Sequence, residues 1–360
     1  MKKLRDSNFE LLRCVLMFMV VLVHYNNSGM GNALSYVEKG SINYYLLSFI
    51  ESLAIIGTNG FVLLTGYFSW KKSSVSLRKP IGLLIYVVAY NVLFYGINLF
   101  FLQEQFSLKS LVFSFVPRNW YIVLYVVLLL LSPYINLMLQ GLNKKSCLIL
   151  IGIMVLLFSV WPSVLEVVSN NIGISTEGMH TIAINGSSNG YSIVNFVMLY
   201  IIGAGISKFN LFQATFKMDI VGYLLCSIAI CIQQVSIGGG WSYANPIVII
   251  SCVCFFNMFR KLKLKSKCIN TLSTASLGVF LLHTQYVVCN KIWSLCGIEN
   301  ACEKSVPYLV IHMFLVCIVT YLICSVLDIC GRWAVKPISN ILDRIPFLTQ
   351  EMVYIEENRG

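Results

Sequence analysis

The chain has 360 residues, of which 58% are hydrophobic and only 11% are charged, and its formal net charge is +11. Soluble domains carry roughly 25% charged residues, so this composition excludes an ordinary water-soluble fold and requires lipid as part of the solvent. The positive charge does not indicate nucleic acid binding, because the cations occur in short clusters between apolar runs.

Apolar runs of about 17–24 residues recur between polar breaks. They predict an all-α integral membrane protein, a bundle of about ten transmembrane helices. In chain order the predicted spans are Leu11–Tyr25, Tyr44–Phe68, Ile81–Leu102, Trp120–Leu139, Cys147–Leu165, Tyr191–Ile206, Ile220–Val235, Ala244–Phe259, Leu272–Trp293 and Val306–Ile329. No signal-peptide cleavage site follows Tyr25, so we expect the first run to be a retained helix.

The lysines and arginines are divided unequally between the two sides of these spans. With the N-terminus placed in the cytoplasm, twenty of them fall in inner segments and five in outer segments. This bias predicts an even number of spans with both termini cytoplasmic. The largest outer loop is predicted at Glu166–Gly190. We expect residues 1–335 to form one transmembrane domain and residues 336–360 a short cytoplasmic tail.

Most of the thirteen cysteines lie inside apolar segments, where they act as small hydrophobic residues. No CxxC pair occurs, so the sequence predicts no structural zinc site and no other metal centre. Cys296 and Cys302 share a short segment predicted to lie outside, which leaves a disulfide between them open.

Arg13 and His24 are eleven residues apart on the first predicted helix. This spacing is three turns plus about 20°, so both side chains point to one face, separated along the axis by roughly 16 Å. Ionisable groups inside a bilayer mark function or pair with one another. Two interpretations stay open on spacing alone. One is a site with a cation at its inner end and a base at its outer end; the other is a snorkelling arginine and an interfacial histidine.

Three further ionisable residues lie well inside predicted spans, Glu51, His283 and His312, while Glu10, Glu166, Asp219 and Asp328 lie near span ends. Glu51 is in the outer half of the second span and is a candidate to orient His24. His283 is either a catalytic partner or a buried structural histidine. We expect His312 and His180 to be structural or solvated.

Four motifs in order resemble the acyltransferase 3 family of bacterial membrane acyltransferases. They are Arg13 with His24 (an Arg-x10-His spacing), Gly57–Phe68 (GTNGFVLLTGYF), the Trp-containing helix Asn119–Tyr134, and Ser276–His283 (SLGVFLLH). The resemblance spans nearly the whole chain. This sequence departs from the family in having Asn59 where many members are acidic, Thr65 in place of serine, and Arg78-Lys79 in place of an Arg-x-x-Arg pattern.

The resemblance implies an enzyme that moves an acyl group, expected to be acetyl, from cytoplasmic acyl-coenzyme A to a hydroxyl of an extracytoplasmic glycan or another cell-surface acceptor. It implies His24 and Arg13 as catalytic residues, since a histidine suits proton removal near neutral pH. Acyl-coenzyme A would be a co-substrate, and no cofactor is expected. The expected location is the bacterial cytoplasmic membrane, with the lipid bilayer as a partner and no nucleic acid.

The donor is rich in phosphate, so we expect cations near its entry. Arg78 and Lys79, with Trp120 as a stacking residue, are the predicted donor-binding group. Asn59 is predicted to support the site, as are Glu51 and His283. The alternative function is a transporter that exports a polysaccharide precursor. Inverted repeats with paired broken helices would favour that alternative, and the sequence contains none that we detect.

Overall fold

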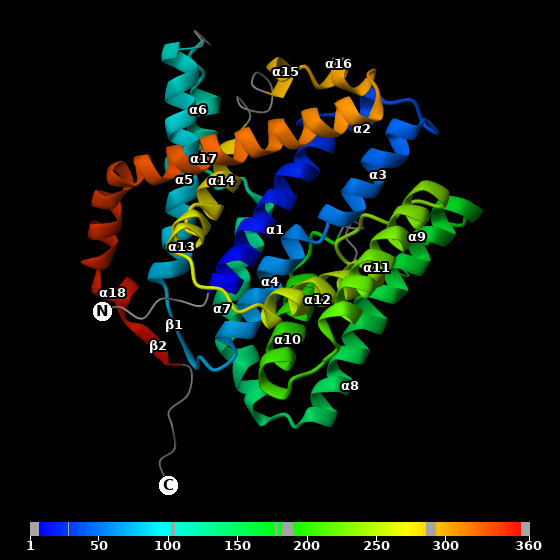
Figure 1. The fold of residues 1–360 in the computed structure, drawn as a ribbon. Helices are drawn as coiled ribbons and strands as arrows, with labels where there is room; N and C mark the ends of the chain where they lie inside the picture. Colours follow the sequence, from blue (N-terminus) through cyan, green and yellow to red (C-terminus); the bar gives the residue numbers. More distant parts are fainter. Residues whose placement is uncertain are drawn as a thin grey trace.

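The computed structural model describes residues 7–27, 29–101, 105–176, 179, 181, 190–285 and 293–353. Within these ranges the chain is almost entirely helical (Figure 1). The strands described there, β1 (Ser74–Ser76) and β2 (Glu351–Val353), form one short antiparallel pair. The predicted all-α class is therefore confirmed.

Seven helical stretches among the described residues are long and apolar enough to cross a membrane. They are α1 (Ser7–Asn26), α3 with α4 (Ile42–Ala54, Gly57–Ser69), α5 (Arg78–Phe101), α7 (Trp120–Gly141), α8 with α9 (Lys144–Val155, Trp161–Ile172, joined by the π-helical η1, Leu156–Val160), α11 (Phe216–Ser236) and the first part of α17 (Val306–Asp343). Each overlaps a predicted span, so the protein is a multi-pass membrane protein.

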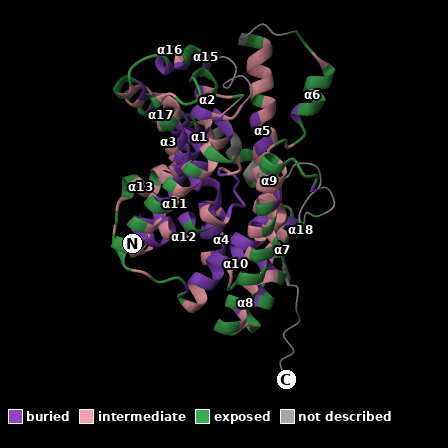
Figure 2. Ribbon diagram, turned by 90° about the vertical axis from the view of Figure 1, so that its right-hand side faces the viewer, coloured by how far each residue is buried: buried purple, intermediate pink, exposed green. Residues whose placement is uncertain are grey.

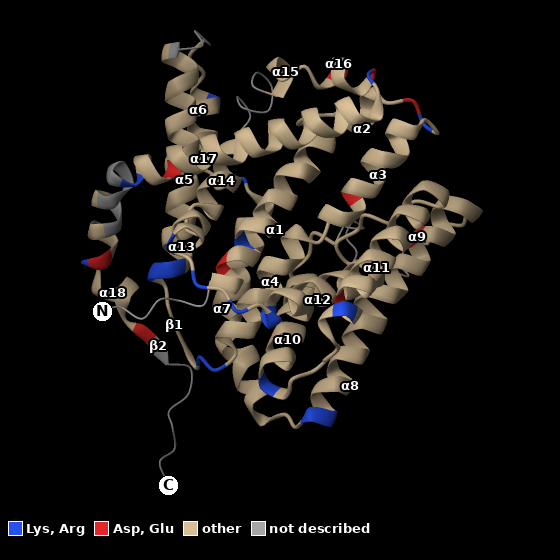
Figure 3. Ribbon diagram, viewed as in Figure 1, with Lys and Arg blue, Asp and Glu red and all other residues tan. Residues whose placement is uncertain are grey.

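The other three predicted spans correspond to shorter helices. These are α10 (Ile193–Phe209), α12 (Pro246–Lys261) and the pair α13 (Lys267–Ser273) and α14 (Ser276–His283). The ninth predicted span runs into residues 286–292, which lie outside the described residues, as does His180. The count of ten and the cytoplasmic termini therefore stay predictions. Figure 3 shows the lysines and arginines gathered mainly in the half of the molecule where α1 begins. This uneven distribution of cations is the bias from which the cytoplasmic termini are predicted.

α1 lies inside the bundle and α5 lies at its edge. α1 contacts α3, α4, α12, α13, α14 and α17. Most of its side chains are buried, whereas few of those on α5 are (Figure 2). Because neighbouring helices shield α1 from lipid, it can carry the polar side chains of Arg13 and His24 at membrane depth.

Glycines of α4 bring its backbone close to two neighbouring helices. A Cβ at Gly57 would meet the carbonyl oxygen of Leu16 on α1, and a Cβ at Gly66 would overlap the carbonyl of Tyr200 on α10. A Cβ at Gly203 of α10 would likewise overlap the carbonyl of Leu63 on α4. Small residues of this kind let helices in a membrane approach closely. The predicted motif Gly57–Phe68 thus sets how α4 packs.

The second predicted span is broken rather than continuous. α3 ends at Ala54 and α4 begins at Gly57. Near the break, the Tyr223 hydroxyl of α11 donates to the carbonyl of Leu53 at 2.9 Å. Irregular backbone at membrane depth is tolerated where protein groups satisfy it in this way.

α17 continues past residue 336, where the predicted cytoplasmic tail begins, and ends at Asp343. The division into residues 1–335 and 336–360 stays a prediction. β2 then pairs with β1, and Nε of Arg78 donates to Oδ1 of Asp343 at 2.6 Å. This hydrogen bond holds the pKa of Asp343 below its ordinary value. The end of the chain is thereby attached to the loop before α5.

Short helices complete the described chain. They are α2 (Ala33–Tyr36), α6 (Leu108–Ser114), α15 (Trp293–Leu295), α16 (Ile298–Cys302) and α18 (Pro346–Thr349). Cys296 and Cys302 are not joined by a disulfide. The Cys302 thiol instead donates to the carbonyl of Ala33 at 3.6 Å, so the disulfide left open by the sequence does not form here.

Candidate functional site

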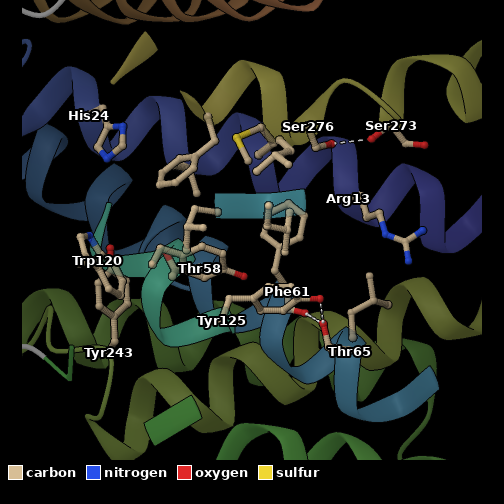
Figure 4. A pocket seen from close by; sticks show the side chains of 18 of the residues that line it. Arg13, His24, Thr58, Phe61, Thr65, Trp120, Tyr125, Tyr243, Ser273 and Ser276 are labelled. Atoms are coloured by element: carbon tan, nitrogen blue, oxygen red, sulfur yellow. Dashed lines mark hydrogen bonds between the residues drawn. The ribbon is translucent and has the colours of Figure 1, made fainter. Parts of the chain in front are cut away.

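A cavity of about 610 Å³ lies between α1, α4, α5, α7 and the α13–α14 segment. Arg13 lies at one end of it, and His24, Trp120 and Tyr243 lie at the other (Figure 4). We call these the Arg13 end and the His24 end. Arg13 and His24, predicted to lie on one face of α1, therefore line the same cavity. Both side chains are partly exposed to it.

At the Arg13 end, a carboxylate orients the guanidinium. Nη1 of Arg13 donates to Oε1 of Glu10 at 2.6 Å. The other oxygen, Oε2 of Glu10, accepts from the Ser273 hydroxyl at 2.6 Å. Lys79 also lines the cavity, close enough to Arg13 for the two charges to repel. Two cations thus line this end, and one of them is paired with Glu10, so the net charge of the three groups is positive and suits an anionic ligand.

At the His24 end, two histidines and a carbonyl form a chain. Nδ1 of His283 lies 2.5 Å from the carbonyl oxygen of Val279, and Nε2 of His283 lies 2.7 Å from Nδ1 of His24. A carbonyl only accepts, so Nδ1 of neutral His283 carries the proton and its Nε2 accepts from His24. Nδ1 of His24 is then protonated and Nε2 holds the lone pair. Within the described chain, Nε2 of His24 makes no hydrogen bond, as a base requires.

Three aromatic rings contact one another at the His24 end. The Trp120 ring lies 4.3 Å from that of Tyr191 and 5.9 Å from that of Tyr243, and the two tyrosine rings are 5.5 Å apart, measured between centroids. Nδ2 of Asn59 donates to the carbonyl of Tyr243 at 2.8 Å, which holds that loop in place. Burial raises the pKa of Tyr243, so its hydroxyl is neutral. Trp120, predicted beside the donor cations, lies at the opposite end.

Four predicted site residues do not line the cavity. Asn59 and His283 are hydrogen-bonded to residues that do, whereas Glu51 and Arg78 have other partners. Glu51 is buried and accepts from Nδ2 of Asn26 at 3.0 Å, and no hydrogen bond joins it to His24. The side chain hydrogen-bonded to His24 is that of His283, which has the orienting role predicted for Glu51. Arg78 does not line the cavity and is paired with Asp343, so the structure brings Lys79, but not Arg78, to the Arg13 end.

Sequence reasoning missed several of the residues that complete the cavity. Glu10 is three residues before Arg13, a spacing that allows an ion pair on a helix. Its second partner, Ser273, is 263 residues away along the chain. Tyr191 and Tyr243 come from loops and carry no motif. Nothing in the local sequence could have placed these last three in the site.

Among the described residues, no group of three or more His, Cys, Asp or Glu side chains could hold a metal ion. The charged or titratable nitrogen groups that line the cavity are those of Arg13, His24 and Lys79.

A family model described as an acyltransferase domain matches residues 6–327, nearly the whole chain. The matched range includes every residue placed above at the two ends of the cavity. No curated protein and no solved structure matches the chain. The protein therefore belongs to the acyltransferase 3 family and is a multi-pass membrane acyltransferase.

Proposed function

We propose that the protein transfers an acyl group, expected to be acetyl, from cytoplasmic acyl-coenzyme A to a hydroxyl of an extracytoplasmic glycan or another cell-surface acceptor. The observation that carries this proposal is the single cavity with two cations at one end and a histidine base at the other. A reaction between a phosphate-bearing thioester and a neutral hydroxyl needs both ends.

The reaction proceeds by general base catalysis. Nε2 of His24 takes the proton of the acceptor hydroxyl as that oxygen attacks the thioester carbonyl. The C–S bond then breaks, the acyl group becomes an ester on the acceptor, and His24 returns the proton to the leaving thiolate. Coenzyme A departs as the free thiol. Nε2 of His24 remains the basic nitrogen throughout. Nδ1 of His24 donates to Nε2 of His283, and Nδ1 of His283 donates to the carbonyl of Val279.

The donor binds with its phosphates at the Arg13 end. The middle of the cavity is lined by apolar side chains, among them Phe61, Leu64 and Phe280, which suits a narrow pantetheine arm. Arg13 and His24 are roughly 16 Å apart along α1, a distance such an arm can span. The thioester reaches His24 while the nucleotide part stays at the cations.

Deletion of the gene and mass spectrometry of surface glycans test the function in cells. We expect the acyl mass to be lost on deletion and restored by the wild-type gene. The His24→Ala variant should not restore it, because loss of a general base lowers the rate by about 10²–10⁴. The control is His312→Ala, since His312 bonds to Tyr25 and to the carbonyl of Cys296 and does not line the cavity.

Unchanged glycan masses in the deletion strain would contradict the acceptor class. Full restoration by His24→Ala, with the protein present at wild-type level in the membrane, would contradict the catalytic role. The exporter alternative relied on the same helices and intramembrane charges. Membership of an acyltransferase family favours the enzyme. The expected location remains the bacterial cytoplasmic membrane.

A further inference from the structure

The aromatic cluster at the His24 end, formed by Trp120, Tyr191 and Tyr243, is not used by the chemistry above. Its rings come from three separate parts of the chain, the start of α7 and the loops before α10 and α12. All three line the cavity; Trp120 and Tyr191 are 38% and 44% exposed, whereas Tyr243 is 8% exposed and packs against the other two rings. Large aromatic faces that are exposed in a cavity usually contact a ligand.

Dedicated packing holds the two loops that carry the tyrosines together. Gly190, which precedes Tyr191, has a φ of +79°, and a Cβ there would lie 2.5 Å from the backbone nitrogen of Ala244, which follows Tyr243. The Ser159 hydroxyl donates to the carbonyl of Ala244 at 2.5 Å. With the Asn59 bond to Tyr243, these contacts make the cluster a preformed surface, which lowers the entropic cost of binding.

The charges around the cavity restrict what can bind to this surface. Among the described residues that line the cavity there is no aspartate or glutamate, while Arg13 and Lys79 are present. An aromatic cluster can bind a quaternary ammonium group. The carboxyl group of Glu51 lies near Tyr191 and Tyr243, but it is buried, accepts from Asn26 and does not line the cavity, so it cannot pair with a cationic ligand there. A neutral or acidic ligand is favoured instead.

A sugar ring has the matching chemistry. One face of a pyranose presents C–H groups, which pack on the electron-rich faces of aromatic rings. Its hydroxyls project from the ring edge, where Asn27 and Thr58 line the cavity together with His24. A ring stacked on the cluster would therefore present a hydroxyl toward the base.

We propose that Trp120, Tyr191 and Tyr243 form the acceptor subsite, and that it takes a neutral or acidic sugar ring by stacking. This inference rests on the proposed function and deepens it by naming the chemical class and the binding surface of the acceptor. It also moves Trp120 from donor binding to acceptor binding. The distinction is measurable, because a donor residue and an acceptor residue affect different affinities.

The test uses the full chain in lipid nanodiscs with methyl β-glycosides of glucose, N-acetylglucosamine and glucuronic acid as probes. Saturation-transfer NMR measures their binding, and acetyl-coenzyme A binding and thiol release are measured separately. We expect at least one glycoside to bind through the C–H protons of its ring. Trp120→Ala should weaken that binding roughly twofold to twelvefold, the range for one aromatic contact, and leave acetyl-coenzyme A affinity unchanged. Trp120→Phe, which keeps a ring, should retain most of the binding.

Trp161 supplies the matched control. It is 40% exposed, much as Trp120 is, but it does not line the cavity. Trp161→Ala should change neither affinity. Phe68→Ala is the converse variant, because Phe68 lines the cavity next to Phe9 of α1, on the Arg13 side. It should weaken acetyl-coenzyme A binding and spare the glycosides.

Several outcomes would overturn the subsite. They are binding of choline in preference to every glycoside, an absence of glycoside binding while His24-dependent thiol release persists, or a loss of acetyl-coenzyme A affinity in Trp120→Ala with glycoside affinity intact. The second outcome leaves the proposed function standing. If glycosides bind at Trp120 but His24-dependent thiol release is absent, the proposed function fails and the sugar site stands.

Discussion

The hydrogen bond between His24 and His283 determines which nitrogen of His24 is available as a base. The His24 ring donates to the His283 ring, which in turn donates to the carbonyl of Val279. A histidine whose second nitrogen is fixed in this way has a defined tautomer and orientation. His283 thus acts through His24 and is a positioning residue in this mechanism.

This role predicts different results for two substitutions of His283. In His283→Gln, the side-chain oxygen can still accept from Nδ1 of His24, so kcat should fall by less than about tenfold. In His283→Met the acceptor is lost, and kcat should fall by about 10²-fold or more, as in the loss of a base. Initial rates measured over a range of pH give kcat for each variant and its pH dependence. A purely structural role would give both variants the same pH profile, with the loss confined to the amount of folded protein.

Arg13 has one nitrogen on Glu10, and its other donors make no further hydrogen bond among the described residues. Arg13→Ala should raise the KM for acyl-coenzyme A by about tenfold or more, since charge-assisted bonds to phosphate are lost. Arg13→Lys should rescue only part of this loss, because an ammonium cannot offer the bidentate fork. Arg118→Ala is the control, since Arg118 is exposed and does not line the cavity. An unchanged donor KM in Arg13→Ala would exclude the proposed contact.

At the scale of helices, the interface between α4 and α10 depends on glycine. Gly66 lies against the backbone of Tyr200, and Gly203 lies against that of Leu63. The α4 motif places Thr65 next to Gly66, and the Thr65 hydroxyl lies 3.1 Å from that of Tyr125 on α7 at the cavity. The packing of α4 therefore sets one wall of the site.

Gly66→Ala should destabilise the protein by about 1–3 kcal/mol or more, as overpacking in a close-packed interior does. Gly152→Ala is the matched control, because Gly152 is also helical and a Cβ there would meet no atom within 4 Å. Thermal unfolding in detergent should show a lower Tm for Gly66→Ala and no decrease for Gly152→Ala. Equal Tm values for the two variants would show that α4 and α10 can separate at little cost.

At the scale of the whole molecule, the division of cations predicts the sidedness of the reaction. Ser73 and Ser175 are exposed and lie on opposite predicted sides. In a background without reactive native thiols, Ser175→Cys should react with an impermeant maleimide on intact cells. Ser73→Cys should react only after permeabilisation. The reverse pattern would invert the predicted topology.

Sided proteoliposomes should form product with the donor inside and the acceptor outside, since the cavity runs along α1 from Arg13 to Asn27. Product formed only with both substrates on the donor side would contradict transfer across the membrane.

Composition, hydropathy and motif order were enough to predict the membrane class, the positions of seven spans, the family and the Arg13–His24 face. They suffice because lipid imposes long apolar helices and because helical spacing sets which residues share a face. The tertiary structure alone decided that His283 is the partner of His24, and that Ser273 is the second partner of Glu10. It also separated Arg78 and Trp120 from Lys79, which the sequence had grouped together. These contacts join residues that lie far apart in the chain, and no local periodicity encodes how distant helices meet.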